Sequence, residues 1–167
     1  MSYLDHFRQV TTFVFDVDGV FTNNEILVTE AGELLRKMNV RDGYAVKVAI
    51  QQGYRIAIIS GGRSEGVRKR FADLGIEDIY LGKQEKTEAF EEFLHTYDLH
   101  PEEILYMGDD LPDYPVMRRV GAPACPNNAA HELLQISVYV SPLNGGEGCV
   151  RDVVEQVLRL QGKWTEL

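Results

Sequence analysis

Short, uninterrupted apolar runs alternate with longer amphipathic segments along this chain, and this alternation constrains the fold more than any other feature. The runs are rich in β-branched and aromatic residues, and the stronger ones lack the apolar–polar alternation of a half-exposed strand. Such runs are typical of strands that are buried on both faces of a parallel sheet. We therefore predict strands at 12–15, 56–59, 79–81 and 104–107, and a weaker strand at 138–140.

The segments between these runs have the periodicity of amphipathic helices. In the clearest one, Val67, Phe71 and Leu74 fall on one helical face, and Gly75 follows as a C-cap. A short helical turn is expected at Pro101, just before the fourth strand. Repeated strand–helix units predict an α/β fold with a mainly parallel sheet flanked by helices. The predicted helices cover 42–52, 64–74, 86–97, 111–119, 129–135 and 148–160.

Residues 21–41 interrupt the strand–helix rhythm directly after the first strand. Apolar residues at 26–28 and 34–40 flank a turn at Glu30-Ala31-Gly32, and this pattern predicts a β-hairpin. No repeat and no linker divides the chain. We therefore expect residues 1–167 to form one domain that carries the hairpin as a flap.

The charge balance argues against several classes of partner. The chain has 26 acidic and 17 basic residues, a net charge of −9, which disfavours nucleic acid and anionic membrane surfaces. No apolar run has the length of a membrane span and the N-terminus lacks a signal-peptide pattern, so we expect a cytoplasmic protein. Cys125 and Cys149 form no CxxC pair, and no two histidines form the HxxxH pair of a zincin-type site.

Polar side chains follow each of the first four predicted strands. Because ligands of open α/β sheets bind outside the carboxyl ends of the strands, these side chains are expected to meet at one edge. The sheet would bring together five carboxylates, a hydroxyl and a lysine. They are Asp16 and Asp18 after the first strand, Ser60 after the second, Lys86 after the third, and Asp109, Asp110 and Asp113 after the fourth.

Carboxylates this close repel one another unless a cation lies among them. Oxygen ligands without His or Cys favour Mg²⁺, and Asp16 and Asp109 are its natural side-chain ligands. A metal-bound carboxylate beside a phosphate can be a nucleophile, which here would form an aspartyl-phosphate. Asp18, two residues further on, would protonate the leaving oxygen and then activate water.

The remaining polar groups suit the phosphoryl oxygens. The Ser60 hydroxyl, backbone N–H groups near Gly61 and the Lys86 ammonium would hold them. Each motif alone has a simpler interpretation: a turn or calcium loop at 16–19, a helix N-terminus at 109–113, an N-cap at Ser60 and a solvated lysine at position 86. Their combination, in order and each at a strand end, is far more specific than any one part.

With these residues in order, the chain resembles the haloacid dehalogenase (HAD) superfamily over nearly its whole length. The four motifs are the FDVDGV sequence at 15–20, Ser60-Gly61, Lys86 and the GDDLPD sequence at 108–113. The resemblance implies a Rossmann-like core in which Asp16 is the nucleophile and Asp18 the general acid and base. It implies that Ser60 and Lys86 bind phosphate. By the same resemblance, Mg²⁺ is bound by Asp16, Asp109 and the Asp18 carbonyl, with Asp110 and Asp113 supporting these ligands from behind.

The second aspartate of the first motif favours a phosphatase or a phosphotransferase over a dehalogenase. Only about 40 residues separate Asp18 from Ser60, and the hairpin and one helix fill them, so the cap domain of most superfamily members is expected to be absent. An open site of this kind needs a large substrate or another subunit to cover it.

Two segments narrow the resemblance further. The sequences NVRDGY at 39–44 and GGEGCVR at 145–151 are similar to those of capless 3-deoxy-D-manno-octulosonate 8-phosphate (KDO 8-phosphate) phosphatases. The resemblance implies a homotetramer joined through the hairpins, with each site borrowing residues from a neighbour. The implied reaction releases KDO and phosphate, a step toward lipopolysaccharide. Taken alone, NVRDG indicates only a hairpin exit followed by an N-cap at Asp42.

The chain also departs from that family's pattern. The family commonly reads TGRK after the second strand, where this chain has Ser60-Gly61-Gly62-Arg63, and many members read GGRG where this chain has GGEG at 145–148. The GGEG form is more typical of nonulosonate (KDN-type) 9-phosphate phosphatases, so a nine-carbon substrate stays open as an alternative. Arg41, Arg63 and Arg151 are candidates for binding the sugar-acid carboxylate, although each would also suit a protein surface.

A noncatalytic assembly module is the remaining alternative, because some sugar-nucleotide synthetases carry a domain of this family that serves association. Such a module needs none of the motif residues. The presence of Asp16, Asp18, Ser60, Lys86 and Asp109 therefore favours an enzyme, a phosphoric monoester hydrolase.

Overall fold

A six-stranded parallel sheet forms the centre of the molecule in the computed structural model, which describes residues 1–165. The strand order is β5-β4-β1-β6-β7-β8, and every neighbouring pair is parallel. The strands are β1 (Thr12–Phe15), β4 (Arg55–Ile59), β5 (Asp78–Tyr80), β6 (Ile104–Met107), β7 (Ala122–Cys125) and β8 (Tyr139–Val140). β1 therefore lies at the middle of the sheet, between β4 and β6.

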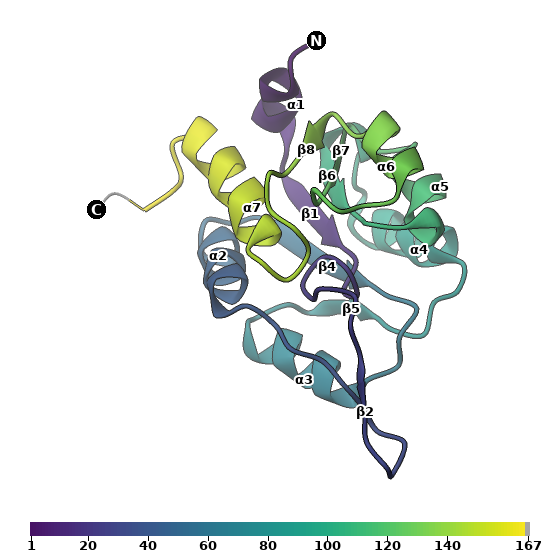
Figure 1. The fold of residues 1–167 in the computed structure, drawn as a ribbon. Coiled ribbons are helices and arrows are strands. Elements are labelled where there is room, and N and C mark those ends of the chain that lie inside the picture. The colour runs from purple at the N-terminus through teal and green to yellow at the C-terminus, as the bar shows by residue number, and fades with distance from the viewer. Residues whose placement is uncertain (166–167) are drawn as a thin grey trace.

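Helices cover both faces of this sheet (Figure 1). On one face, Phe13 and Phe15 of β1 pack into a core with residues of α1 (Tyr3–Gln9), α2 (Val40–Gln51), α3 (Glu65–Asp73) and α7 (Cys149–Leu160). On the other face, Val14 packs with residues of α4 (Lys86–Tyr97), α5 (Tyr114–Met117) and α6 (His131–Ile136). Successive β1 side chains thus enter opposite cores, which explains why this strand is apolar at every position.

The predicted α/β fold with a parallel sheet is confirmed, and most strands lie where the apolar runs placed them. The strands at 12–15 and 104–107 match at both ends, β4 begins one residue early at Arg55, and β5 is shifted by one residue. β7 was not predicted. Its sequence, APAC, has no β-branched or aromatic residue and contains Pro123, so it lacks the signal on which a strand prediction depends.

Most of the helices also lie where the sequence predicted them. The prediction at 86–97 matches α4, and the short turn at Pro101 is η1 (Pro101–Glu103). The helix predicted at 111–119 is instead two short elements, η2 (Leu111–Asp113) and α5, because Pro112 and Pro115 interrupt a continuous helix. α1 was not predicted. No helix within residues 1–165 is long and apolar enough to cross a membrane.

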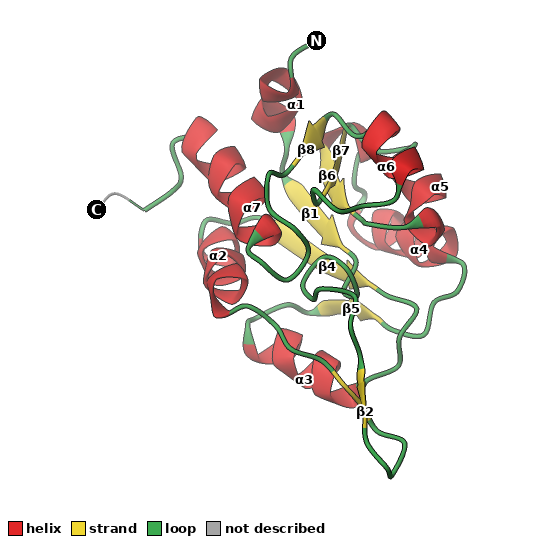
Figure 2. Cartoon of the chain, viewed as in Figure 1, coloured by secondary structure: helices red, strands yellow, loops and turns green. Residues whose placement is uncertain are grey.

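The predicted hairpin is present directly after β1. β2 (Leu27–Val28) and β3 (Leu34–Leu35) pair antiparallel and project away from the central sheet (Figure 2). Their four side chains are all exposed, from 47% at Leu35 to 67% at Leu27. An isolated two-stranded hairpin is marginal in water, and exposed apolar side chains that gather on one element are typical of interaction sites.

α2 and α7 lie side by side, and a buried carboxyl joins them. Asn39, not Asp42, is the N-cap of α2, so the alternative interpretation of NVRDG as an Asp42 cap is wrong. Asp42 lies in the first turn, fully buried, and one of its oxygens accepts a hydrogen bond of 2.7 Å from the backbone N–H of Arg151 in α7. Because Gly148, the N-cap of α7, has no side chain, Asp42 caps that helix from outside. The two family-like segments therefore contact each other.

Candidate active site

The carboxyl ends of β1 and β6 bring the first and last motifs together. The two strands are neighbours in register, with Phe15 opposite Met107, so the residues that follow them are adjacent. The backbone N–H of Asp16 continues this pairing with a 3.1 Å hydrogen bond to the Met107 carbonyl. Sheet topology alone thus places Asp16 beside the loop that carries Asp109.

A cavity of about 330 Å³ opens at this edge of the sheet. Its walls come from the segments that follow β1, β4, β5 and β6, as the strand-end rule requires. Its lining includes all eight residues predicted to bind metal or phosphate or to support these ligands, namely Asp16, Asp18, Ser60, Gly61, Lys86, Asp109, Asp110 and Asp113.

Lys86 is the cation at the base of the cavity. It is the first residue of α4 and is 5% exposed. Its ammonium lies 2.9 Å from Oδ1 of Asp16 and 2.7 Å from Oδ1 of Asp113. Burial lowers the pKa of Lys86, but the charges of Asp16 and Asp113 outweigh this effect and raise it, so the ammonium stays charged.

Asp113 connects several groups of the site through hydrogen bonds to its two oxygens. One of its oxygens accepts from Lys86 and from the Tyr106 hydroxyl, each at 2.7 Å. The other accepts from the backbone N–H groups of Asp109 at 3.1 Å and Asp110 at 3.4 Å. A carboxylate with this many donors is committed to the protein, so Asp113 orients its neighbours and Asp16 and Asp109 are left to face a cation.

The acidic groups fit a divalent cation. One oxygen each of Asp16, Asp109 and Asp113 lies within 4.8 Å of the others, and all three residues are buried. Burial and repulsion from Asp113 raise the pKa of Asp16 well above its usual range, against the effect of Lys86. Burial raises the pKa of Asp109 to about 6, partly offset by a hydrogen bond from Asn24. Groups this costly to ionise favour a bound cation, and their oxygen-only chemistry suits Mg²⁺.

Asn24 supports Asp109 from the loop after β1. Its side-chain amide donates a 2.6 Å hydrogen bond to Oδ2 of Asp109. The Asn24 backbone has a φ of 71°, a left-handed conformation that asparagine tolerates better than most residues. A side chain at Gly19 would collide with the same carboxylate, since a Cβ there would lie 1.9 Å from Oδ2. The loop is therefore shaped around Asp109.

Asp18 lies on the other side of the cavity and outside the buried acidic group. Its two oxygens accept hydrogen bonds from Arg36, at 2.7 Å from Nε and 3.1 Å from Nη2. Its side chain is 30% exposed, so it faces the open part of the cavity. This is the position from which a carboxyl could exchange a proton with a leaving group rather than bind the metal through its side chain.

Ser60 and Gly61 form the wall opposite Asp109. Ser60 is 3% exposed, and its backbone donates to the Tyr80 carbonyl and accepts from the N–H of Lys83, which ties the ends of β4 and β5 together. Its hydroxyl accepts a 3.3 Å bond from the N–H of Gly62. The N-cap of α3 is Ser64, so Ser60 is not the cap that its simpler interpretation suggested.

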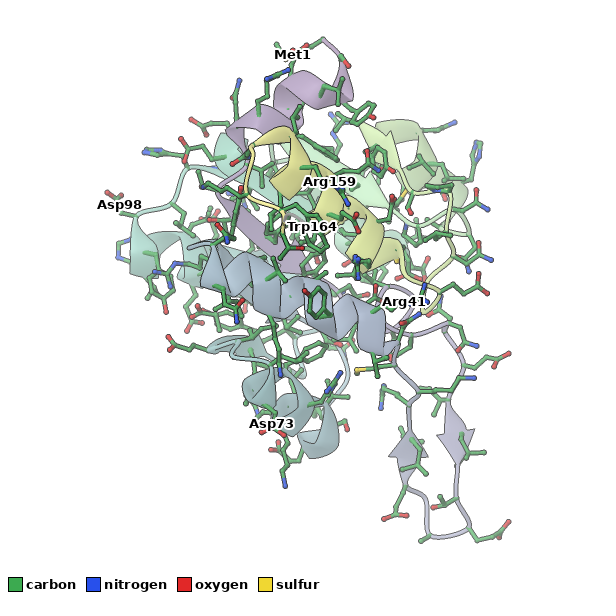
Figure 3. The ribbon with its side chains drawn as sticks, turned by 90° about the vertical axis from the view of Figure 1, so that its left-hand side faces the viewer. Met1, Arg41, Asp73, Asp98, Arg159 and Trp164 are labelled. Carbon is green, nitrogen blue, oxygen red and sulfur yellow. The ribbon has the colours of Figure 1, made fainter. Side chains whose placement is uncertain are left out.

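None of the three candidate arginines lines the cavity of its own chain. Arg41 is exposed at the start of α2, at the end nearest the hairpin (Figure 3), and Arg63 is exposed beside Gly82. Arg151 binds Glu155 at 2.6 Å and stacks over Trp164. Their role in substrate binding stays a prediction.

Three residues that contact the predicted site were missed from the sequence: Asn24, Arg36 and Tyr106. None belongs to a motif that ends a predicted strand. Tyr106 belongs to an apolar run and reads there as a core residue, while Arg36 comes from the hairpin. Only the Asn23-Asn24 pair carried a local signal, because asparagine favours turns with a positive φ.

Comparison with known proteins extends these observations. A family model described as haloacid dehalogenase-like hydrolase matches residues 32–121. The 3-deoxy-D-manno-octulosonate 8-phosphate phosphatase of Escherichia coli K12 is 38% identical over 159 residues, which cover 95% of this chain and 85% of that protein.

Solved structures agree with the sequence comparison. The phosphatase of the same name from Yersinia pestis has a TM-score of 0.94 at 37% identity, covering 96% of this chain and 87% of that one. The Moraxella catarrhalis enzyme, solved with magnesium, phosphate and KDO, has a TM-score of 0.93 at 29% identity, covering 96% and 92%. With its motif residues gathered around one cavity, the chain belongs to the haloacid dehalogenase-like hydrolases and, among them, to the family of the 3-deoxy-D-manno-octulosonate 8-phosphate phosphatases.

Proposed function

We propose that this chain is a magnesium-dependent phosphatase that hydrolyses KDO 8-phosphate to KDO and inorganic phosphate, a step toward lipopolysaccharide. The observation that carries the proposal is the contact of 2.9 Å between Lys86 and Asp16, in a cavity that Asp18 and Ser60 also line. A carboxylate with a buried ammonium beside it suits attack on a phosphoryl group, because the ammonium offsets the charge of the incoming oxygens. Family membership supports the same reaction.

In the first half of the reaction, an oxygen of Asp16 attacks phosphorus. The bond between phosphorus and the sugar oxygen breaks, and the electron pair of that bond stays on the sugar oxygen. Asp18 supplies the proton that this oxygen takes up, so the sugar leaves as a neutral alcohol at that position. Ser60, the N–H groups near Gly61 and Lys86 hold the three phosphoryl oxygens meanwhile.

In the second half, water attacks phosphorus and gives a proton to Asp18, which returns to its starting state. The bond between Asp16 and phosphorus breaks, and inorganic phosphate is released. Asp16, Asp109 and the Asp18 carbonyl would hold Mg²⁺, which screens the phosphoryl oxygens from the nucleophile's charge. Asp110 caps η2 and Asp113 fixes Lys86, so both act by orienting the groups that touch the substrate.

The nine-carbon alternative rests on one segment. Glu147 of the GGEG loop lies in a pocket of about 280 Å³ that Lys37 and Asn39 also line. Measuring kcat/KM on KDO 8-phosphate and on a nonulosonate 9-phosphate, each with Mg²⁺, decides between the two. We expect the eight-carbon ester to be preferred. A clear preference for the nine-carbon ester would overturn the substrate, and phosphate release from neither would restore the noncatalytic assembly module.

The assembly of the protein is part of the proposal. We propose that residues 1–167 act as one domain without a cap, that four copies associate through the flap at 21–41, and that the protein is cytoplasmic. The exposed apolar hairpin supports association. In such an assembly Arg41, Arg63 and Arg151 would bind the sugar acid, each at the site of its own chain or of a neighbour. Light scattering on a sizing column tests the tetramer.

A further inference from the structure

Arg36 makes a contact that the proposed reaction does not use. It follows β3 at the base of the hairpin, where the apolar side chains of β2 and β3 are exposed, yet its own side chain is only 7% exposed. Nε and Nη2 each donate to a different oxygen of Asp18, at 2.7 and 3.1 Å, and Nη1 donates to the Leu34 carbonyl at 3.3 Å. A guanidinium held this way is a two-point contact that also orients the hairpin.

Gly62 makes room for this guanidinium. A Cβ at Gly62 would lie 3.0 Å from Nη2 of Arg36, 3.5 Å from Oδ2 of Asp18 and 3.7 Å from the Ser60 hydroxyl. Arg36 therefore occupies the space between Gly62 and Asp18, both of which line the cavity.

The arrangement of charge suggests what Arg36 binds. Lys86, at the base, is already shared between Asp16 and Asp113. Arg36 lies beside Asp18, the residue proposed to protonate the organic part of the ester as it leaves. The leaving oxygen must reach an oxygen of Asp18, and the guanidinium covers both. Arg36 must therefore release at least one of them when a substrate enters, and an oxygen-rich, anionic leaving group offers it new acceptors.

We infer that Arg36 is a substrate-binding residue for the sugar-acid part of the ester. In the free enzyme Arg36 holds Asp18, and it turns to the substrate when the substrate binds. The inference rests on the proposed function and adds a residue to it. Substrates that lack oxygen acceptors on the leaving group would not engage Arg36. Selectivity for a polyhydroxy acid over simple esters would follow from this exchange of partners.

The test compares two phosphate esters in Arg36→Ala, Arg36→Lys and wild type. For KDO 8-phosphate, we expect Arg36→Ala to lower kcat/KM by about 10- to 100-fold, mainly through KM, and Arg36→Lys to restore part of the loss. For p-nitrophenyl phosphate, whose leaving group has no sugar acid, kcat/KM should stay within about threefold of wild type. Lys69→Ala is the control, because that cation is exposed on α3 and makes no contact with Asp18 among the described residues; it should leave both esters unchanged.

A second variant leaves residue 36 intact. Gly62→Ala crowds the Arg36 guanidinium and should raise KM for KDO 8-phosphate by a larger factor than KM for p-nitrophenyl phosphate. An equal fall on both esters in Arg36→Ala would mean that Arg36 only positions Asp18, and no fall on either would mean that it has no role; both overturn the inference. Failure of the proposed function looks different, since wild type itself would then turn over p-nitrophenyl phosphate but not KDO 8-phosphate.

Discussion

At the residue scale, two aspartates that are equally buried differ in how their oxygens are hydrogen-bonded. Asp113 and Asp42 are both 0% exposed, but Asp113 accepts from four donors whereas Oδ2 of Asp42 has no partner among the described residues. Donors on both oxygens offset the cost of burying a carboxylate. A half-satisfied one favours its protonated form, so Asp42 links the contact between α2 and α7 to pH.

The pH dependence of stability should therefore carry a contribution from Asp42. Burial raises the pKa of Asp42 from 3.8 to about 6, against the hydrogen bond and charge of Arg151. Because the folded state binds the proton more tightly, this contribution to stability is fully present below pH 3.8 and is lost as the pH rises through about 6. Its size is about 3 kcal/mol.

Asp42→Asn keeps an oxygen acceptor for the Arg151 N–H and removes the ionisation. We expect the variant to gain stability relative to wild type by up to about 3 kcal/mol between pH 4 and pH 7. Urea unfolding of both proteins across this range, without metal, measures the difference. Parallel stability profiles would show that Asp42 does not titrate in this way.

Replacing Asp16, the proposed nucleophile, should separate activity from folding. Asp16→Asn removes the attacking oxygen's charge but keeps the shape of the side chain. We expect kcat on p-nitrophenyl phosphate to fall by a factor on the order of 10⁴ or more, with the metal-free melting temperature unchanged or higher because a buried carboxylate is gone. Substantial residual turnover would remove Asp16 from its proposed role.

At the scale of elements, loops rather than helices determine the positions of the side chains in the site. Gly145 and Gly146 belong to the tail loop, which connects β8 to α7. They lie directly on the backbone of the loop after β1, which carries Asp18 and Asn24. A Cβ at Gly145 would lie 1.9 Å from the carbonyl oxygen of Gly19, so only glycine permits this approach. Asp42 then fixes the start of α7, to which the tail loop leads.

Gly145→Ala should push these two loops apart. We expect lower thermal stability and a loss of kcat/KM of about tenfold or more, because Asp18 and Asn24 would shift. The matched control is Gly66→Ala in α3, where a Cβ meets only the Ser64 hydroxyl at 3.7 Å. That variant should be neutral or more stable by up to about 1 kcal/mol. Differential scanning calorimetry with activity assays distinguishes them, and full activity in Gly145→Ala would contradict the loop contact.

Charges on the hairpin test its role in association. The double variant Leu27→Glu and Leu35→Glu adds charge to an exposed apolar face without disturbing a core. We expect it to be a folded monomer with reduced activity, seen by light scattering and phosphate release. Leu4→Glu changes an exposed leucine of α1 and should leave the assembly intact. Wild-type assembly and activity in the double variant would exclude the hairpin as the interface.

The elements also show how far sequence reasoning reaches. Apolar runs located β1, β4 and β6 to within one residue because buried central strands have little choice of composition. β7 escaped because Ala, Pro and Cys can form a strand only where its neighbours require one. The strand-end rule gathered Asp16, Ser60, Lys86 and Asp109 correctly. It could not find Arg36, whose approach to Asp18 depends on the fold of the whole hairpin.

At the scale of the whole molecule, the chain's charge and its open cavity belong together. The net charge of −9 includes the five carboxylates that line the cavity, where a divalent cation, Lys86 and Arg36 would offset them. An acidic protein can in this way bind an anionic substrate. Because Arg36 connects the exposed hairpin to Asp18, association through the hairpin would also affect catalysis.

If Asp16 carries the phosphoryl group during turnover, a pre-steady-state experiment with Asp18→Asn should trap it there. p-Nitrophenol leaves without needing a proton, so the first step should proceed in this variant while the second, which needs Asp18 to activate water, should stall. With Mg²⁺ we predict a burst of one nitrophenol per chain, followed by slow release, and one phosphoryl group on the peptide that contains Asp16. Linear release without a burst, or a phosphoryl group on another residue, would contradict the account.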